Sequence, residues 1–239
     1  INKMDRVGAD FNDVIRGIKE RLGARPVPIQ IPVGVEDTFQ GAVDLVRQRA
    51  VLFTDEMGSD PKVVPIPAEL QEEARLGREA IVEALADFDE EIMALFLDAK
   101  PVPDDLVRSA LRRSTIAMEL VPVLCGSAFK NKGVQLLLDA VVDYLPSPMD
   151  LPPTMGTDPE TGGSVMRECR VDAPFAALAF KIMVDPFVGR LAFCRIYSGS
   201  MDSGMALENV GAGKKERVGR ILRMHANKRE ELESAHAGL

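Results

Sequence analysis

The chain twice repeats one local pattern, in which a short apolar strand ends in a polar turn and the turn leads into an amphipathic helix. In the first copy, the turn Asn2–Asp5 precedes a helix that begins after Asp10. In the second copy, the apolar segment 121–124 is followed by the turn 126–128 and by a helix from Gly133. In an open α/β sheet, such turns lie where ligands bind. The pattern predicts an α/β fold whose two polar turns converge on one ligand.

Both helices have recognisable ends in the sequence. Asp10 is a suitable N-cap for the first helix and Gly23 a suitable C-cap, because Asp accepts hydrogen bonds from free backbone N–H groups and Gly adopts the left-handed conformation. Pro146 stops the second helix. The apolar residues that we expect to face inward are Phe11, Val14, Ile15, Ile18 and Leu22 in the first helix and Val134, Leu137, Leu138, Val141 and Leu145 in the second.

Asn2, Lys3 and Asp5 have side chains suited to reading a guanine ring. The Asp5 carboxylate can accept hydrogen bonds from the ring N1–H and the exocyclic amine, which adenine does not offer together. The Asn2 amide can serve the other base edge, and the Lys3 stem can lie over the ring face. So short a motif also occurs by chance. The other interpretation is an Asn/Asp-rich turn that enters a helix.

A separate α+β unit is predicted between the two turns, and it is an insertion because a strand-to-helix connection normally takes few residues. From Glu36 to Asp105 it holds 18 acidic and 6 basic residues. Such an acidic exterior is either a solvated face or a docking surface for a partner. The predicted elements are an extended segment over 26–32, a strand pair within Gly41–Phe53, helices over Ala68–Asp87 and Asp89–Leu97, and a third helix from Asp104 with Val107, Ala110, Leu111 and Met118 inward.

The last third of the chain is predicted to be all-β. A segment rich in Pro, Gly, Asp and Thr from Pro146 to Gly163 is typical of an interdomain linker. Beyond it, the predicted strands are Ala176–Val184, Leu191–Tyr197 and Arg217–Met224, with turns at Asp185–Gly189 and Ser198–Ser200. Short strands at regular spacing indicate a small barrel. Residues 209–229 include 7 basic and 1 acidic residue, a charge that suits contact with phosphates, although alternate strand positions can divide these residues between two faces.

The three cysteines, Cys125, Cys169 and Cys194, are far apart and form no Cys-x-x-Cys pair. This usage predicts reduced thiols in a cytoplasmic protein, with neither a metal site nor a disulfide framework. Neither His225 nor His236 has partners at metal-ligand spacing. No apolar run approaches the ~20 residues that span a bilayer, so we expect no membrane contact.

Several segments closely resemble bacterial elongation factor G, in the same order and spacing as in that family. They are Val123–Gln135, Asp143–Pro148, Phe180–Ile182, Asp185–Gly189, Tyr197–Gly199 and Met224–Glu230. The resemblance spans essentially the whole chain, and it implies a translational GTPase that moves transfer RNA and messenger RNA on the ribosome during elongation. The alternative is a related translational GTPase, such as a ribosome-recycling paralogue or a ribosomal protection protein. The run Ser127–Gly133 favours the first.

The resemblance implies an α/β and β fold: the C-terminal part of a P-loop GTPase (Ras-like) domain with an α+β insertion, followed by a truncated translation-factor β-barrel. The implied boundaries are 1–27 and 117–150 for the GTPase part, 28–116 for the insertion, 151–171 for a linker and 172–239 for the barrel. The implied guanine contacts are Asn2, Lys3, Met4, Asp5, Ser127 and Ala128. In the family, a backbone N–H of the second turn faces the guanine O6.

The resemblance also implies two ribosomal partners. The acidic insertion would meet the stalk protein of the large subunit, and the barrel would contact small-subunit ribosomal RNA. The basic residues expected to contact that RNA are Lys214, Lys215, Arg217, Arg220, Arg223, Lys228 and Arg229.

The sequence has no Gly-x-x-x-x-Gly-Lys-Ser/Thr loop, which in this class of enzyme cradles the phosphates and helps to hold Mg²⁺. The segment Gly211–Lys215 lacks a following Ser/Thr and is predicted to be a hairpin turn. In the family, the phosphate loop and switch segments precede the guanine motif. We therefore expect a fragment of a GTPase that carries GTP/GDP specificity without Mg²⁺ ligands or catalytic residues, and that is catalytically incompetent alone. We also expect an incomplete barrel and a non-native Leu239, since family members usually have Asp there.

Overall fold

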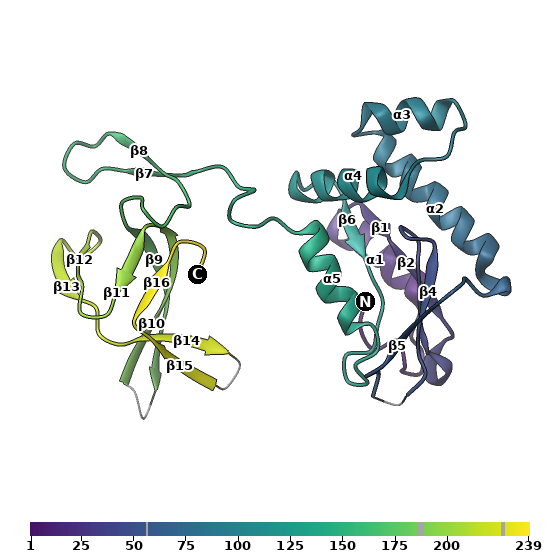
Figure 1. Cartoon of the computed structure of the whole chain (residues 1–239), viewed down its shortest axis with the longest axis horizontal. Coiled ribbons are helices and arrows are strands. Elements are labelled where there is room, and N and C mark those ends of the chain that lie inside the picture. Colours follow the sequence, from purple (N-terminus) through teal and green to yellow (C-terminus); the bar gives the residue numbers. More distant parts are fainter. Residues whose placement is uncertain (56, 186–188, 226–227) are drawn as a thin grey trace. The chain divides into compact units, whose positions relative to one another are not determined.

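The computed structural model describes residues 1–55, 57–185, 189–225 and 228–239. The chain divides into two compact units, Ile1–Leu145 and Pro146–Leu239 (Figure 1). The first unit contains all the described helices, and the secondary structure described in the second unit consists of strands.

The first unit combines a parallel strand pair, an antiparallel sheet and helices. Its helices are α1 (Phe11–Leu22), α2 (Gln71–Ala86), α3 (Glu90–Leu97), α4 (Asp104–Ile116) and α5 (Val134–Tyr144), with 3₁₀ turns η1 (Glu36–Thr38) and η2 (Ala68–Leu70). Strand β1 (Pro26–Pro28) pairs in parallel with β6 (Val121–Val123). The antiparallel sheet follows chain order through β2 (Gln30–Val33), β3 (Gly41–Asp44), β4 (Arg49–Phe53) and β5 (Pro61–Val64).

Helix α1 begins and ends as predicted. The side chain of Asp10 accepts a hydrogen bond from the Asp13 backbone N–H at 2.9 Å. Gly23 closes the helix in the left-handed conformation, with φ of 63°. These two caps fix where the chain leaves the first polar turn and where it turns toward β1.

The three helices predicted in the acidic segment are present, with two corrections. Residues Ala68–Leu70 form η2, so α2 itself starts at Gln71. The prediction that Met118 packs from the third helix is wrong, because α4 ends at Ile116. Met118 has φ of 61° and an exposed side chain. A left-handed residue cannot continue the helix, so its side chain leaves the apolar face.

One hydrophobic core joins α2, α3 and α4 to the strands β1–β3 and the start of β4. Its fully buried members include Val43, Leu45, Ile81, Leu85, Ile92, Val107 and Leu111. Tyr144, at the end of α5, belongs to the same core. The acidic segment and the helix that follows the second polar turn are therefore packed as one body.

Arg78 holds α2 against its neighbours through a side chain that is 13% exposed. Its guanidinium donates to the backbone oxygens of Val46 at 2.8 Å and Val102 at 2.9 Å, and to Asp104 Oδ1 at 2.8 Å. Val46 lies in the β3–β4 turn, Val102 lies just before α4, and Asp104 is the first residue of α4. A single buried cation thus satisfies polar groups from two segments that α2 packs against.

Helix α5 does not face the way the sequence predicts. The sequence pattern places Leu137, Leu138, Val141 and Leu145 inward, but all four side chains are exposed. The inward face is instead the series Leu136, Ala140 and Tyr144, which is one i, i+4, i+8 row.

The end of α5 is held from α4. The Arg112 guanidinium donates to the backbone oxygens of Asp143 at 3.0 Å and of Val142 and Leu145 at 3.2 Å. The last carbonyls of a helix have no partner within it, so an external donor is needed there. This anchor sets the rotation of α5.

The second unit is built from antiparallel pairs. The pairs are β7 (Thr154–Thr157) with β8 (Ser164–Arg167), β9 (Ala176–Asp185) with β10 (Gly189–Ser198), β11 (Ser200–Asp202) with β16 (Ser234–His236), β12 (Ala206–Asn209) with β13 (Lys214–Arg217), and β14 (Ile221–His225) with β15 (Lys228–Leu232). A small core of Ile196, Ile221 and Ala235 lies among them.

Several predictions for this unit need correction. The segment predicted as a linker, 151–171, contains the β7–β8 hairpin. The strand predicted over 217–224 is two strands, because β13 ends at Arg217 and β14 begins at Ile221. The glycine-rich hairpin turn before Lys214 is confirmed. The predicted turn at 185–189 and the segment 224–230 are only partly within the described residues.

Replacing Arg78 by Met should destabilise the first unit by about 3 kcal/mol, because the buried carbonyls that it satisfies would lose their donor. The matched control is Arg75→Met, whose ion pairs with Glu72 and Glu79 are exposed to solvent and should contribute little to stability. Urea unfolding followed by helical circular dichroism reports this unit. Equal losses in the two variants would contradict the role assigned to Arg78.

Candidate functional site

The two polar turns lie side by side because the chain segments before them pair. The Ile1 terminal amine donates to the Leu124 carbonyl at 2.6 Å, and the Gly126 N–H donates to the Ile1 carbonyl at 3.0 Å. The Met4 N–H then donates to the Gly126 carbonyl at 3.1 Å. This alternation is that of neighbouring parallel strands. The convergence predicted from the repeated strand–turn–helix pattern is thus observed.

Asn2 connects the turns directly. Its Oδ1 accepts from the Lys3 backbone N–H at 2.8 Å and from the Ala128 backbone N–H at 2.9 Å. Lys3 has φ of 66°, a left-handed conformation that lets the turn fold back onto Asn2. With the oxygen engaged by both turns, a ligand hydrogen bond to Asn2 would fall on its NH₂ group.

Asp5 is ionised at neutral pH and is half-buried beside the second turn. The Ser127 hydroxyl that faces it lowers the pKa of the Asp5 carboxyl, with smaller help from the charges of Lys130 and Arg6. Ser127 is 1% exposed, and its Oγ makes no hydrogen bond within the described chain. Asp5 thus offers an ionised acceptor to a ligand, whereas the Ser127 hydroxyl is buried beneath it.

The second turn is a closed loop from Ser127 to Lys132. The Ser127 N–H donates to the Lys132 carbonyl at 2.8 Å, and the Lys132 N–H returns a bond to the Ser127 carbonyl at 3.0 Å. A Cβ on Gly126 would lie 2.7 Å from the Lys132 oxygen, so only glycine allows this closure. Gly133 follows with φ of 89°, which also favours glycine.

This closure bears on which backbone N–H can face the guanine O6. The resemblance implies that a backbone N–H of the turn holding Ser127 and Ala128 faces that oxygen. In the structure, the Ser127 N–H donates to Lys132 and the Ala128 N–H to Asn2. A base oxygen that takes the Ala128 N–H would have to replace the Asn2 oxygen there.

A small apolar cluster packs beneath the surface at both turns. It contains Met4, Phe11, Phe39, Ala42, Val123 and Cys125. Met4 is thus a buried support for the first turn rather than a polar contact. Burial raises the pKa of the Cys125 thiol to about 12. The thiol is therefore protonated at neutral pH and behaves as a small apolar group.

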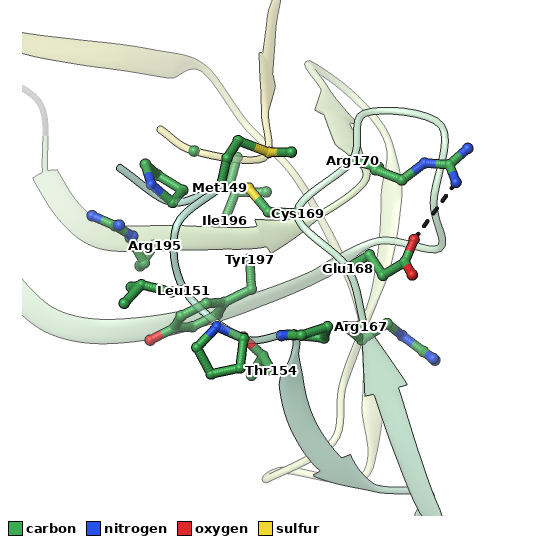
Figure 2. A pocket seen from close by; sticks show the side chains of 14 residues that line it. Met149, Leu151, Thr154, Arg167, Glu168, Cys169, Arg170, Arg195, Ile196 and Tyr197 are labelled. Carbon is green, nitrogen blue, oxygen red and sulfur yellow. Dashed lines mark ion pairs between the residues drawn. The ribbon is translucent and has the colours of Figure 1, made fainter. Parts of the chain in front are cut away.

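A shallow hollow of about 270 Å³ lies against the first turn, lined by residues that include Asn2, Lys3, Met4, Arg6 and Asp13. A second hollow, of about 310 Å³, lies in the other unit (Figure 2). Figure 2 shows Leu151, Arg195 and Tyr197 among the residues around it. The residues around this second hollow include none of those predicted to contact guanine or RNA. The first hollow has Asn2, Lys3 and Met4 in its lining, but Asp5, Ser127 and Ala128 do not line it.

The predicted RNA-contacting residues lie on β13, β14 and β15 and on the segment between β13 and β14, and all are exposed. Arg223 forms an ion pair with Glu230 at 2.6 Å, and Arg217 donates to the Gly204 carbonyl at 2.8 Å. Lys214 lies 3.9 Å from Glu216. The two carboxylates reduce the net charge that Arg223 and Lys214 offer to a partner, and the Gly204 carbonyl occupies one donor of Arg217. The other predicted contacts are Lys215, Arg220, Lys228 and Arg229.

Residues of the inserted unit contact the site, and no sequence pattern predicts them. Gln30 Oε1 accepts from the Cys125 N–H at 3.3 Å, and Lys132 Nζ donates to the Phe39 carbonyl at 3.2 Å. Glu36 Oε1 accepts from the Gly8 N–H at 2.7 Å. Each contact uses a main-chain atom on one side, and the first two join residues 95 and 93 positions apart. No local motif can therefore mark them.

Across the residues that the structure describes, no three His, Cys, Asp or Glu side chains are grouped so that they could hold a metal ion. Among the same residues, no helix has the length and apolar character needed to cross a bilayer.

Comparison with known proteins agrees with the fold. Residues 1–147 match the family model of the elongation factor Tu GTP binding domain, and residues 174–239 match that of elongation factor G domain 2. A crystal structure of a protein from Thermus thermophilus superimposes with a TM-score of 0.74 over 99% of this chain, at 24% sequence identity. The chain spans 32% of that protein's length. The predicted fold class, a GTPase domain followed by a translation-factor β domain, is confirmed.

Replacing Ser127 by Ala should raise the pKa of Asp5 toward its ordinary value, because the facing hydroxyl is the largest cause of the lowered pKa. Carboxyl carbon chemical shifts followed against pH by NMR would measure this change. Asp172, whose pKa is lowered by Arg170 in the other unit, serves as an internal control and should not move. An unchanged Asp5 titration would contradict the pairing of these two residues.

Proposed function

The chain belongs to the family of elongation factor Tu GTP-binding domains, and we propose that it is part of a ribosomal GTPase that translocates transfer RNA and messenger RNA during elongation. Within that cytoplasmic protein, the residues of this chain recognise guanine and dock on the ribosome. The match of residues 174–239 to elongation factor G domain 2 supports a role in elongation. The sequence resemblance of the whole chain to that factor supports it further.

The observation that carries the proposal is the joining of the two polar turns by Asn2 and Ala128. In the proposed complex, the Asp5 carboxylate accepts from the guanine N1–H and exocyclic amine. The guanine O6 takes the Ala128 N–H, and the Asn2 amide, released from that bond, serves the other base edge. Lys3 lies over the ring. Adenine leaves these polar groups unsatisfied, which is the physical source of base specificity.

The residues of this chain fit the base of GTP or GDP but not its phosphates. The ionised Asp5 and the amide of Asn2 suit a purine edge with donors and acceptors. The sequence contains no phosphate loop, so we assign it no Mg²⁺ ligand and no step of hydrolysis. Hydrolysis in the parent protein uses phosphate and Mg²⁺ contacts of the kind that P-loop proteins provide.

We further propose that separate segments of the chain have separate functions. Residues 1–27 and 117–150 form the guanine-reading part, 28–116 form the acidic insertion and 172–239 form the barrel, while the segment 151–171 before the barrel carries the β7–β8 hairpin. The insertion meets the large-subunit stalk protein, and its acidic helices α2 and α3 support this choice because Glu72, Glu73, Glu90 and Glu91 crowd their first turns. The barrel contacts small-subunit ribosomal RNA through its basic strands.

The chain alone should bind GDP with a dissociation constant of about 0.1 mM or weaker and should not hydrolyse GTP, because base contacts lack the phosphate and Mg²⁺ interactions. Asp5→Ala should abolish this binding, while Asp139→Ala on the exposed side of α5 should leave it unchanged. NMR titration measures such weak binding. If the unaltered chain binds GDP with a micromolar or lower dissociation constant, most of the affinity does not come from phosphate contacts, and this prediction is wrong.

The chain should bind small-subunit ribosomal RNA with strong salt dependence, and the double variant Lys215→Glu and Lys228→Glu should reduce the affinity about tenfold or more. Phosphate contacts release counterions, so each lost contact also flattens the salt dependence. Filter binding at several salt concentrations tests this. Lys62→Glu in the first unit, where Lys62 pairs with Asp60, is the control. Equal losses in the control and the double variant would argue against a barrel surface for RNA.

A further inference from the structure

The loop that carries Ser127 and Ala128 is held from outside by one carbonyl of the inserted unit. Gly58 lies in the turn after β4, and its backbone oxygen accepts from Asn131 Nδ2 at 3.2 Å and from Gln135 Nε2 at 3.0 Å. Asn131 belongs to the 127–132 loop, and Gln135 belongs to the first turn of α5. One acceptor thus ties the loop to the helix that follows it.

Close packing reinforces these two hydrogen bonds. Gly58 is buried with φ of 55°, and a Cβ built on it would lie 2.7 Å from the Asn131 oxygen and 2.8 Å from the Lys130 oxygen. Backbone therefore meets backbone, without a side chain between them. Any residue other than glycine would push the 127–132 loop away.

The turn that contains Gly58 has hydrogen bonds of its own. The Asp55 carboxylate accepts from the Ser59 backbone N–H at 2.9 Å and from the Ser59 hydroxyl at 2.7 Å. These bonds lower the pKa of Asp55 to about 2, so the carboxylate is fully ionised at neutral pH. The Asp55–Ser59 hydrogen bonds therefore stabilise the turn from which the Gly58 carbonyl accepts its two hydrogen bonds.

The same insertion also contacts the segment between the first polar turn and α1, and the far end of the loop. Glu36 accepts from the Gly8 N–H, and the Phe39 carbonyl accepts from Lys132 Nζ. Phe39 and Gly58 therefore contact the second turn from the insertion, and Glu36 contacts the chain just after the first turn. An insertion that served only as a docking arm would not need to touch the site at these points.

We propose that Gly58, Asn131 and Gln135 form a latch through which the inserted unit holds the 127–132 loop in the conformation that reads guanine. The inference rests on the proposed guanine recognition and names positioning residues for it. None of the three contacts the base itself in the proposed complex. Opening the latch frees the Ala128 N–H from its fixed position and weakens guanine binding without unfolding the unit.

The test uses a double variant, Asn131→Asp with Gln135→Glu, which keeps both shapes but replaces each donor with a carboxylate oxygen facing the Gly58 carbonyl. Asp tolerates the left-handed φ of 53° that Asn131 adopts. The matched control is Asn12→Asp with Gln71→Glu, which makes the same chemical change at exposed helical positions. A second variant, Gly58→Ala, opens the latch from the other side.

Amide hydrogen exchange by NMR on the whole chain measures the loop directly. In both latch variants, the amides of Ser127, Ala128 and Lys132 should exchange about tenfold faster, as expected for the loss of one to two net hydrogen bonds. Amides in α2 should keep their rates, which shows that the unit remains folded. Unchanged loop exchange in both latch variants, with α2 intact, would overturn the proposal.

GDP titration tests the latch separately from the proposed guanine recognition. If the unaltered chain shows no shift at Asn2 or Ala128 with GDP, the proposed guanine recognition fails, while the exchange measurement still decides whether the latch holds the loop. If the unaltered chain binds GDP, the latch variants should bind about tenfold more weakly than the matched control. Equal GDP binding by latch variants and control would overturn the latch as a positioning device.

Discussion

The structure of the first unit depends on one hydrogen-bonded pairing between residues far apart in the chain. Ile1 and Met4 pair with Leu124 and Gly126, and Asn2 then bonds to Ala128. Ile1 and Leu124 are 123 positions apart, so this pairing closes a long loop. Closing such a loop costs entropy that grows only slowly with its length. A folded insertion is therefore tolerated at this point, provided that it returns the chain to its partner strand.

The chain returns to its partner strand because the insertion packs against β1, β6 and α5. β1 and β6, which bound it, pair in parallel, so the chain that leaves at the end of β1 must cross back to the opposite end of the pair, where β6 begins. Arg47 then forms ion pairs with Asp44 and with Asp143 on α5, the latter at 2.7 Å. Because Tyr144, the neighbour of Asp143, lies in the core of the insertion, the position of α5 and of the loop before it depends on the folding of the insertion.

Local features could be read from the sequence because their causes are local. The Asp10 and Gly23 caps of α1 and the Asp89 cap before α3 follow from residues within a few positions. Each polar turn is also a local feature, whereas the pairing that brings the two turns together joins distant residues. The rotation of α5 could not be predicted, because it is set by Arg112 and by the Leu136–Tyr144 row rather than by the more abundant leucines and valines. An apolar stripe identifies a helix, but it does not identify which of two apolar faces is covered.

The contacts at the edge of the candidate site could not be predicted for a different physical reason. Two of them use the backbone oxygens of Phe39 and Gly58, and any residue carries such an oxygen. Side-chain identity therefore marks only the donors, Lys132, Asn131 and Gln135, and these belong to the resembling segment without revealing their partner. The glycine at position 58 is required by the backbone that lies against it, which only the fold brings there. Base-reading side chains can thus be recognised in a sequence, whereas the backbone that holds them in place is fixed by tertiary structure.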